Sequence, residues 1–159
     1  MDLACGHGLV AWLMLILDDT SPSALAIDAR LPPSSASLFT AMTRAWPRLE
    51  GRISLEERPI ADVTLDPHDV VVATHACGAL TDAVLDRVLE ARARVALLPC
   101  CHDEATCDTG GLRGWFDLES AVDATRAARL RAHGYTVATQ VIPRAITAKN
   151  RLLIGAPLY

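Results

Sequence analysis

The sequence lacks an apolar run long enough to cross a membrane. Its longest such stretch, Leu9–Leu17, has nine residues, whereas a membrane-spanning helix needs about 20. Asp2 precedes this stretch where a secretory signal peptide would carry basic residues. These two absences predict a cytoplasmic protein with no membrane partner.

Positive charge is also scarce. The 159 residues contain 15 Lys and Arg and 19 Asp and Glu, which gives a net charge of −4, and Lys149 is the only lysine. An acidic chain lacks the electrostatic footprint that binds nucleic acid. Net charge therefore does not indicate a nucleic-acid partner, although a local basic patch can be hidden in the average.

The cysteines lack the spacing of a disulfide framework. There are five, an odd number, and Cys100 and Cys101 are adjacent, unlike the even, spaced cysteines of small secreted domains. Reduced thiols are expected. The sequence also lacks repeats and linkers, and its length suits one domain over residues 1–159.

Short β-like runs alternate with helical runs, which predicts a parallel sheet covered by helices. Strands are expected at 2–4, 25–27, 53–55, 70–73, 95–98, 135–142 and 151–156, the last two as an antiparallel pair. Helices are expected at 9–17, 35–46, 81–90 and 118–133. The first strand is truncated, since a central strand usually has about five residues. The native chain is expected to start upstream of Met1, or a neighbouring segment to compensate.

A glycine-rich turn follows this first strand. Asp2-Leu3-Ala4-Cys5-Gly6-His7-Gly8 lies between strand and helix, where glycines permit a sharp bend and close approach to a ligand. Asp28 ends the second strand, where a carboxylate can accept both ribose hydroxyls of an adenosine. The Gly6-x-Gly8 spacing also satisfies the dinucleotide fingerprint, so spacing alone leaves NAD and S-adenosylmethionine open.

Asp2 separates these two cofactors. A carboxylate just before the glycines would repel the pyrophosphate of NAD at the helix N-terminus. S-adenosylmethionine carries a sulfonium and an ammonium instead, which an acidic group favours. Asp2 therefore favours S-adenosylmethionine.

The segment Asp2–Gly8 resembles the first motif of class I S-adenosylmethionine-dependent methyltransferases, with Ala4 where a glycine is commoner. Asp28 resembles their ribose-binding acid, and Ile60-Ala61-Asp62 resembles the adenine-contacting segment. The resemblance implies a Rossmann-like α/β sheet of order 3-2-1-4-5-7-6 with the seventh strand antiparallel. The cofactor-binding residues that it implies are Asp2, Ala4, Gly6, Gly8, Asp28, Asp62 and His75.

Two further segments follow the fourth and fifth strands. Thr74-His75-Ala76-Cys77-Gly78 and Pro99-Cys100-Cys101-His102-Asp103 should meet at the carboxyl edge of a parallel sheet. They resemble a methyltransferase subgroup with His-x-Cys-Gly and Cys-Cys-His segments, which includes tRNA ribose methyltransferases. Neutral imidazoles accept protons near pH 7, so His75 and His102 are the predicted catalytic bases, oriented by Asp82 or Asp103.

A metal site is the competing interpretation of these side chains. The residues with suitable ligand atoms are His75, Cys77, Cys100, Cys101, His102 and Cys107. However, no Cys-x-x-Cys pair exists, and adjacent Cys100 and Cys101 would point apart if the strand continued through them. Cysteines are also common packing residues. Packing is therefore favoured over zinc, and no metal is predicted.

The predicted function is S-adenosylmethionine-dependent methyl transfer to an acceptor that the sequence does not identify, RNA and small molecules both staying open. Arg144, Lys149 and Arg151 flank the last hairpin turn, where they can contact a phosphate-bearing acceptor. The first alternative is a methyltransferase-like binding module without catalysis. The second, disfavoured by Asp2, is an NAD-dependent oxidoreductase. The oligomeric state is not predicted.

Overall fold

The computed structural model describes residues 1–74 and 76–158. The chain forms two compact units, Met1–Val63 and Thr64–Tyr159. His75, one of the predicted bases, lies outside the described residues. Within them, no helix combines the length and the apolar character that a membrane span requires.

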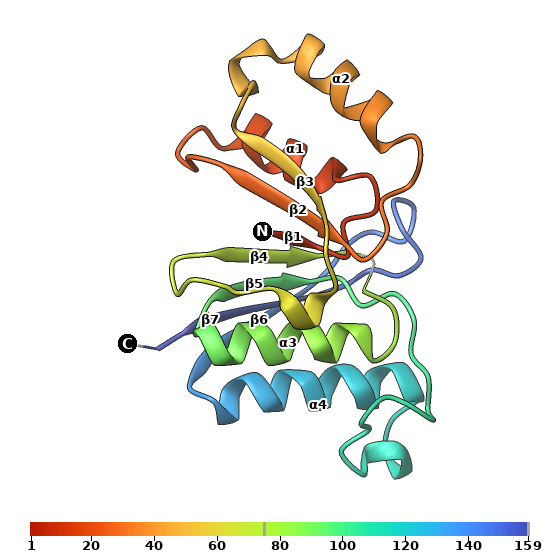
Figure 1. Ribbon diagram of the computed structural model, residues 1–159. Helices are drawn as coiled ribbons and strands as arrows, with labels where there is room; N and C mark the ends of the chain where they lie inside the picture. Colours follow the sequence, from red (N-terminus) through yellow and green to blue (C-terminus); the bar gives the residue numbers. More distant parts are fainter. Residues whose placement is uncertain (75, 159) are drawn as a thin grey trace. The chain divides into compact units, whose positions relative to one another are not determined.

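The first unit contains three strands and two α-helices (Figure 1). In chain order they are β1 (Asp2–Leu3), α1 (Leu9–Leu17), β2 (Ala24–Asp28), α2 (Ser35–Ala45) and β3 (Ile53–Glu57), with short 3-10 helices η1 (Pro47–Leu49) and η2 (Ile60–Asp62). Strand β2 pairs in parallel with β1 and with β3.

The core of this unit follows from helical periodicity. Ala11, Trp12 and Leu15 recur at helical spacing on α1 and are buried. The Trp12 ring meets Phe39 of α2 edge to face, with 5.3 Å between the ring centroids. These contacts attach α2 to α1 and stabilise the layer that supports the turn after β1.

The second unit contains four strands and two α-helices. They are β4 (Val70–Ala73), α3 (Leu80–Ala91), β5 (Arg94–Leu97), α4 (Leu118–Ala132), β6 (Tyr135–Val141) and β7 (Arg151–Pro157), with the 3-10 helix η3 (Leu112–Gly114) before α4. Strands β4 and β5 are parallel, and β7 is antiparallel to both β5 and β6. Helix α4 begins where Asp117 accepts a hydrogen bond from the Ser120 amide, as an N-cap residue does.

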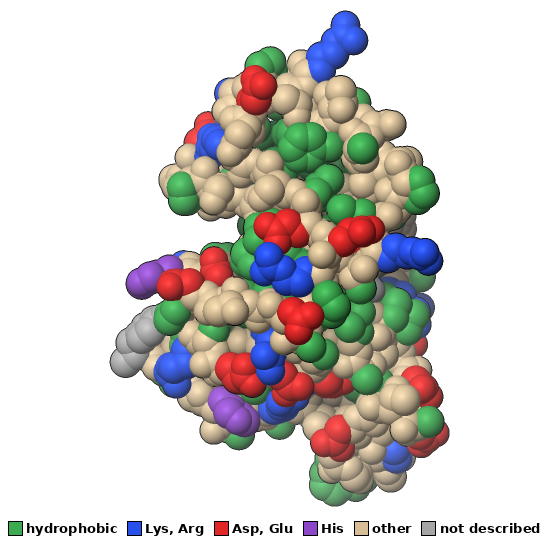
Figure 2. Space-filling model, viewed as in Figure 1, with side chains coloured by type: hydrophobic (Ala, Val, Ile, Leu, Met, Phe, Trp, Pro, Cys, Tyr) green, Lys and Arg blue, Asp and Glu red, His purple; other side chains and the backbone are tan. Residues whose placement is uncertain are grey.

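Helices α3 and α4 lie side by side in the second unit (Figure 1). Figure 2 shows acidic and basic side chains intermixed over these two helices. Arg126 pairs with Asp82, and Arg129 pairs with Asp86, each linking α4 to α3. Ion pairs thus link the two helices.

The strand order β3-β2-β1-β4-β5-β7-β6 confirms the predicted Rossmann-like topology, including the antiparallel seventh strand. The first strand is short, as predicted, with two residues. It ends at Leu3, one residue early, because Ala4 has φ 56°, which no strand residue adopts. Helix α3 begins at Leu80, one residue before the expected start, with Ala79 at the N-cap, and the Thr81 hydroxyl donates to the Ala76 carbonyl.

Candidate functional site

The turn after β1 has a left-handed backbone at three positions. Ala4, Gly6 and Gly8 have φ of 56°, 55° and 74°. Left-handed backbone costs an L-residue about 1–2 kcal/mol and costs glycine almost nothing. The strain at Ala4 gives a physical reason why glycine is commoner there in the motif that this segment resembles.

The two glycines of the turn have different surroundings. A Cβ on Gly6 would meet nothing within 4 Å, whereas a Cβ on Gly8 would lie 2.6 Å from Leu55 Cδ2 and 3.2 Å from Ala26 Cβ. Gly6 therefore borders open space that a ligand can occupy. Gly8 instead allows the start of α1 to pack against β2 and β3, so its cofactor contact stays a prediction while its packing role is visible.

Gly8→Ala is expected to lower the free energy of unfolding by about 2–3 kcal/mol, through backbone strain plus the clash with Ala26. Gly51 is the matched control, because its φ of 75° is nearly the same and a Cβ there would meet nothing within 4 Å. Gly51→Ala should cost only the strain, about 1 kcal/mol. Urea denaturation of both variants measures the difference, and equal losses would rule out the packing role.

Asp28 is held beside the turn by backbone donors. The Gly6 amide donates to Asp28 Oδ2 at 2.9 Å, and the Arg30 amide donates to Oδ1 at 3.1 Å. The half-buried carboxylate is thus fixed at the carboxyl end of β2, with lone pairs left for further donors. The structure therefore brings Gly6 and Asp28 together.

Asp2 lies beneath the same turn and is buried, with 1% of its surface exposed. Its Oδ2 accepts the Ala11 amide at 3.2 Å, and its Oδ1 has no hydrogen-bond partner among the described residues. Burial raises the pKa of Asp2 from 3.8 to about 6. Burial, with the negative charges of Asp2 and Asp28, also raises the pKa of the Cys5 thiol to about 12. The floor of the turn therefore favours a positively charged group.

Asp62 is not joined to this group. It is exposed at the end of η2, and no hydrogen bond or ion pair of its side chain to the turn is present among residues 1–74 and 76–158. Its predicted adenine contact thus has no support from the geometry of the protein alone.

In the second unit, the segments after β4 and β5 meet. The Gly78 amide donates to the Cys101 carbonyl at 3.0 Å. The Sγ atoms of Cys77, Cys100 and Cys101 lie within 4.8 Å of one another, and those of Cys77 and Cys100 are 2.8 Å apart. The hydrogen bond with Cys100 and partial burial raise the pKa of Cys77 to about 12. The prediction that Cys100 and Cys101 point apart does not apply, because β5 ends at Leu97.

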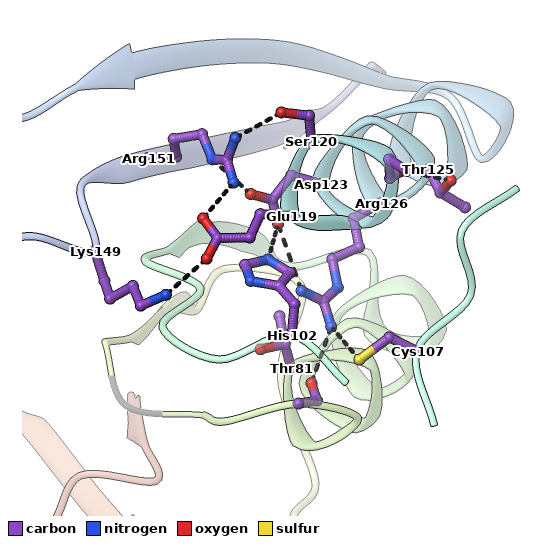
Figure 3. A network of polar contacts seen from close by, with 12 residues as sticks. Thr81, His102, Cys107, Glu119, Ser120, Asp123, Thr125, Arg126, Lys149 and Arg151 are labelled. Atoms are coloured by element: carbon purple, nitrogen blue, oxygen red, sulfur yellow. Dashed lines mark hydrogen bonds and ion pairs between the residues drawn. The ribbon is translucent and has the colours of Figure 1, made fainter. Parts of the chain in front are cut away.

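His102 pairs with an acid that sequence reasoning missed. Its Nε2 lies 2.7 Å from Asp123 Oδ1, with 2% of the side chain exposed, and its Nδ1 is buried without a hydrogen-bond partner among the described residues (Figure 3). Neither predicted orienting acid performs this role. Asp82 pairs with Arg126 instead, and Asp103 accepts the Ala105 amide in its own loop.

Arg126 connects the parts of this network. Its guanidinium donates to Asp82 at 2.6 and 3.0 Å and to the Gly78 carbonyl at 2.9 Å. It also lies 3.5 Å from Asp123, as Figure 3 shows. Arg126 is buried, with 1% of the residue's surface exposed. Asp123 and Arg126 are three residues apart on α4 and therefore lie on the same face of the helix. This spacing is the sequence signal that could have indicated the pair, but no known motif contains it.

A pocket of about 230 Å³ opens beside His102 and is bordered by the three basic residues of the last hairpin turn. Lys149 pairs with Glu119 at 2.7 Å, and Arg151 pairs with Glu119 at 3.1 Å (Figure 3). The hydrogen bond between Lys149 and Glu119 lowers the pKa of Glu119 and raises the pKa of Lys149. Among the described lining residues, Lys149, Arg144 and Arg151 outnumber the carboxylate of Glu119, so the electrostatic field of the pocket favours an anion.

A family model described as a methyltransferase domain matches residues 1–108, more than half of the chain. The chain belongs to this methyltransferase-domain family. Family membership also decides against the oxidoreductase alternative. Comparison with curated protein sequences gave no significant match.

Solved structures share the fold of this methyltransferase domain. Magnesium protoporphyrin IX methyltransferase (ChlM) from Synechocystis PCC 6803, solved with bound SAM, is 12% identical with a TM-score of 0.62, over 99% of this chain and 68% of that chain. The methyltransferase domain of bacterial CtHen1-C is 15% identical with a TM-score of 0.62, over 99% and 88%. The O-methyltransferase NcsB1, solved with SAM and 2-hydroxy-5-methyl naphthoic acid, is 20% identical with a TM-score of 0.59, over 99% and 48%. This chain spans about half the length of NcsB1, and likeness at these identities shows the fold.

Proposed function

We propose that this methyltransferase domain binds S-adenosylmethionine at the turn after β1 and transfers its methyl group to an anionic acceptor. The observation that supports cofactor binding best is the buried Asp2 carboxylate, whose Oδ1 has no hydrogen-bond partner among the described residues. A buried carboxylate with an unsatisfied oxygen is costly in the protein alone. A cationic ligand offsets that cost.

The chemistry of the turn fits this cofactor. Asp2 would face its cationic portion, Asp28 would accept the ribose hydroxyls with the lone pairs left by Gly6 and Arg30, and the open side of Gly6 allows close approach. Bound S-adenosylmethionine supplies a methyl group on a positively charged sulfur. Asp62 is retained as a proposed adenine contact.

His102 is the proposed base. The Asp123 carboxylate accepts a hydrogen bond from Nε2, which assigns the proton to that nitrogen and leaves the Nδ1 lone pair to receive one. The role follows the general pattern in which a carboxylate orients an imidazole. His75, the second proposed base, lies outside the described residues.

The acceptor is proposed to carry phosphate or carboxylate groups. The pocket beside His102 is lined by Arg144, Lys149 and Arg151, and guanidinium groups bind such anions through paired hydrogen bonds. A local basic pocket on an acidic chain suits a small anion or a single phosphate group. Net charge still argues against a long nucleic-acid footprint.

Titration calorimetry with S-adenosylhomocysteine tests the cofactor site. Wild-type protein should bind, and Asp28→Ala should weaken binding by about 10- to 100-fold, because charge-assisted hydrogen bonds are lost. Asp19→Ala, an exposed acid paired with Arg48, is the control. Undiminished binding by Asp28→Ala would refute the site. Binding without methylation of total RNA, protein extract or small anionic acceptors would favour the non-catalytic binding module.

A further inference from the structure

Three of the five cysteines form a cluster that packing does not explain. Cys5 and Cys107 are buried, as free cysteines usually are, whereas Cys77 and Cys101 are exposed and Cys100 is partly exposed. Solvent-facing thiols contribute little to a core. The packing interpretation therefore suits Cys5 and Cys107 and fails for Cys77 and Cys101.

The spacing of the three sulfurs suits a metal ion. Zinc–sulfur bonds of about 2.3 Å in tetrahedral geometry place two sulfurs about 3.8 Å apart. The three Sγ atoms lie within 4.8 Å of one another, with 2.8 Å between Cys77 and Cys100. Shifts of about 1 Å, which rotation of exposed side chains provides, bring them to metal-binding separations.

The backbone under the cluster is fixed by other residues. The Gly78 amide bonds the Cys101 carbonyl at 3.0 Å, which ties the loop after β4 to the loop after β5. The buried Arg126 side chain donates to the Gly78 carbonyl at 2.9 Å. Such supporting contacts orient metal ligands before the ion arrives.

We propose that Cys77, Cys100 and Cys101 form a three-thiolate site for a zinc-like divalent cation, with its fourth position open to water or another ligand. Three thiolates and a divalent ion carry a net charge of −1. Lys149 lies within electrostatic reach, since its pKa is raised mainly by Glu119 and also by Cys101 and Cys100. The proposal does not depend on cofactor binding by the first unit.

Metal titration of the reduced, chelator-treated full chain tests the site. Zn²⁺ should bind at one ion per chain, and Co²⁺ should produce a sulfur-to-cobalt charge-transfer band with the visible spectrum of tetrahedral coordination. Cys100→Ser should weaken Zn²⁺ binding by about 100-fold or more. Cys107→Ser is the control, because that thiol is buried against Arg126 (Figure 3) and is not among the three clustered sulfurs, so the variant should leave affinity unchanged.

A second measurement covers the case in which Cys100→Ser does not fold. In wild-type protein, bound Zn²⁺ should protect Cys77, Cys100 and Cys101 from alkylation, as read by mass spectrometry, and should leave the exposure of Cys5 and Cys107 unchanged. Bound cobalt without a charge-transfer band overturns the proposal. So does unchanged affinity in folded Cys100→Ser, or protection that does not include these three thiols.

Discussion

Asp2→Asn is expected to stabilise the cofactor-free protein by about 1–2 kcal/mol at pH 7.5 while weakening S-adenosylhomocysteine or S-adenosylmethionine binding by about 100-fold. The stabilisation arises because burial raises the pKa of Asp2 to about 6, so the ionised form costs folding free energy at neutral pH. Asparagine keeps an oxygen for the Ala11 amide and removes the charge. The loss of affinity arises because the cationic ligand loses its buried partner.

The pH dependence follows from the direction of this shift. Between pH 3.8 and about 6 the folded state holds a proton on Asp2 that the unfolded chain has released, so stability falls as pH rises through this window. The stabilising effect of Asp2→Asn should therefore vanish below about pH 4 and be complete above about pH 6. Cofactor binding to wild type should weaken below about pH 6, as the carboxylate is neutralised, and should stay flat in the variant.

Chemical denaturation at several pH values and calorimetry at the same values measure both effects. Asp19→Ala serves as the control, because this exposed acid pairs only at the surface with Arg48 and Arg52. A loss of stability at pH 7.5 together with unchanged affinity would mean that Asp2 is a structural residue. That result would remove the main support for the cofactor site.

Arg126→Ala is expected to lower the free energy of unfolding by about 3–5 kcal/mol, the largest loss of stability predicted for this chain. The guanidinium is buried at 1% exposure and is hydrogen-bonded to Asp82 and the Gly78 carbonyl. Its removal leaves the partner carboxylate without its ion pair and the carbonyl without its donor, in addition to a cavity. The loop that carries Cys77 should also loosen, which hydrogen exchange can detect.

Arg129→Ala is the matched control on the same helix. Arg129 lies three residues further along α4 and pairs with Asp86, but both side chains are partly exposed. Surface pairs contribute about 0–1 kcal/mol, so the control should change stability by less than that. Denaturant unfolding compares the free energies of unfolding of the two variants, provided that the dependence on denaturant concentration is the same as in wild type. Equal losses would show that burial of Arg126 contributes nothing specific.

The proximity of the glycine turn to Asp28 in the first unit could be predicted from sequence because it depends on local geometry. A glycine turn that follows one strand and an acid that ends the next lie together whenever the two strands are parallel neighbours. Pairing of Asp2 with Ala26 and Leu3 with Ile27 provides that register, and Asp28 ends β2 beside Gly6. The short first strand was also predictable, since few residues precede the turn.

The partners in the second unit could not be predicted in this way. Asp123, which pairs with His102, lies 21 residues after it in the sequence. The sequence instead predicts Asp82 or Asp103 as the acid that orients the imidazole, because these residues belong to the same two motif segments. Which acid faces the imidazole depends on how α4 packs beside α3. The proximity of Cys77 to Cys100 and Cys101 likewise depends on two loops joined by the hydrogen bond from the Gly78 amide to the Cys101 carbonyl.

The sequence by itself determined the alternation of strands and helices, the position of the glycine turn and the acids that flank it, because hydrophobic period and backbone sterics act over short windows. Only the tertiary structure decided that Asp2 is buried, that Gly8 allows close packing, and which acid pairs with His102. These features arise because packing brings together side chains that are far apart in the sequence, and a local sequence pattern does not determine such contacts.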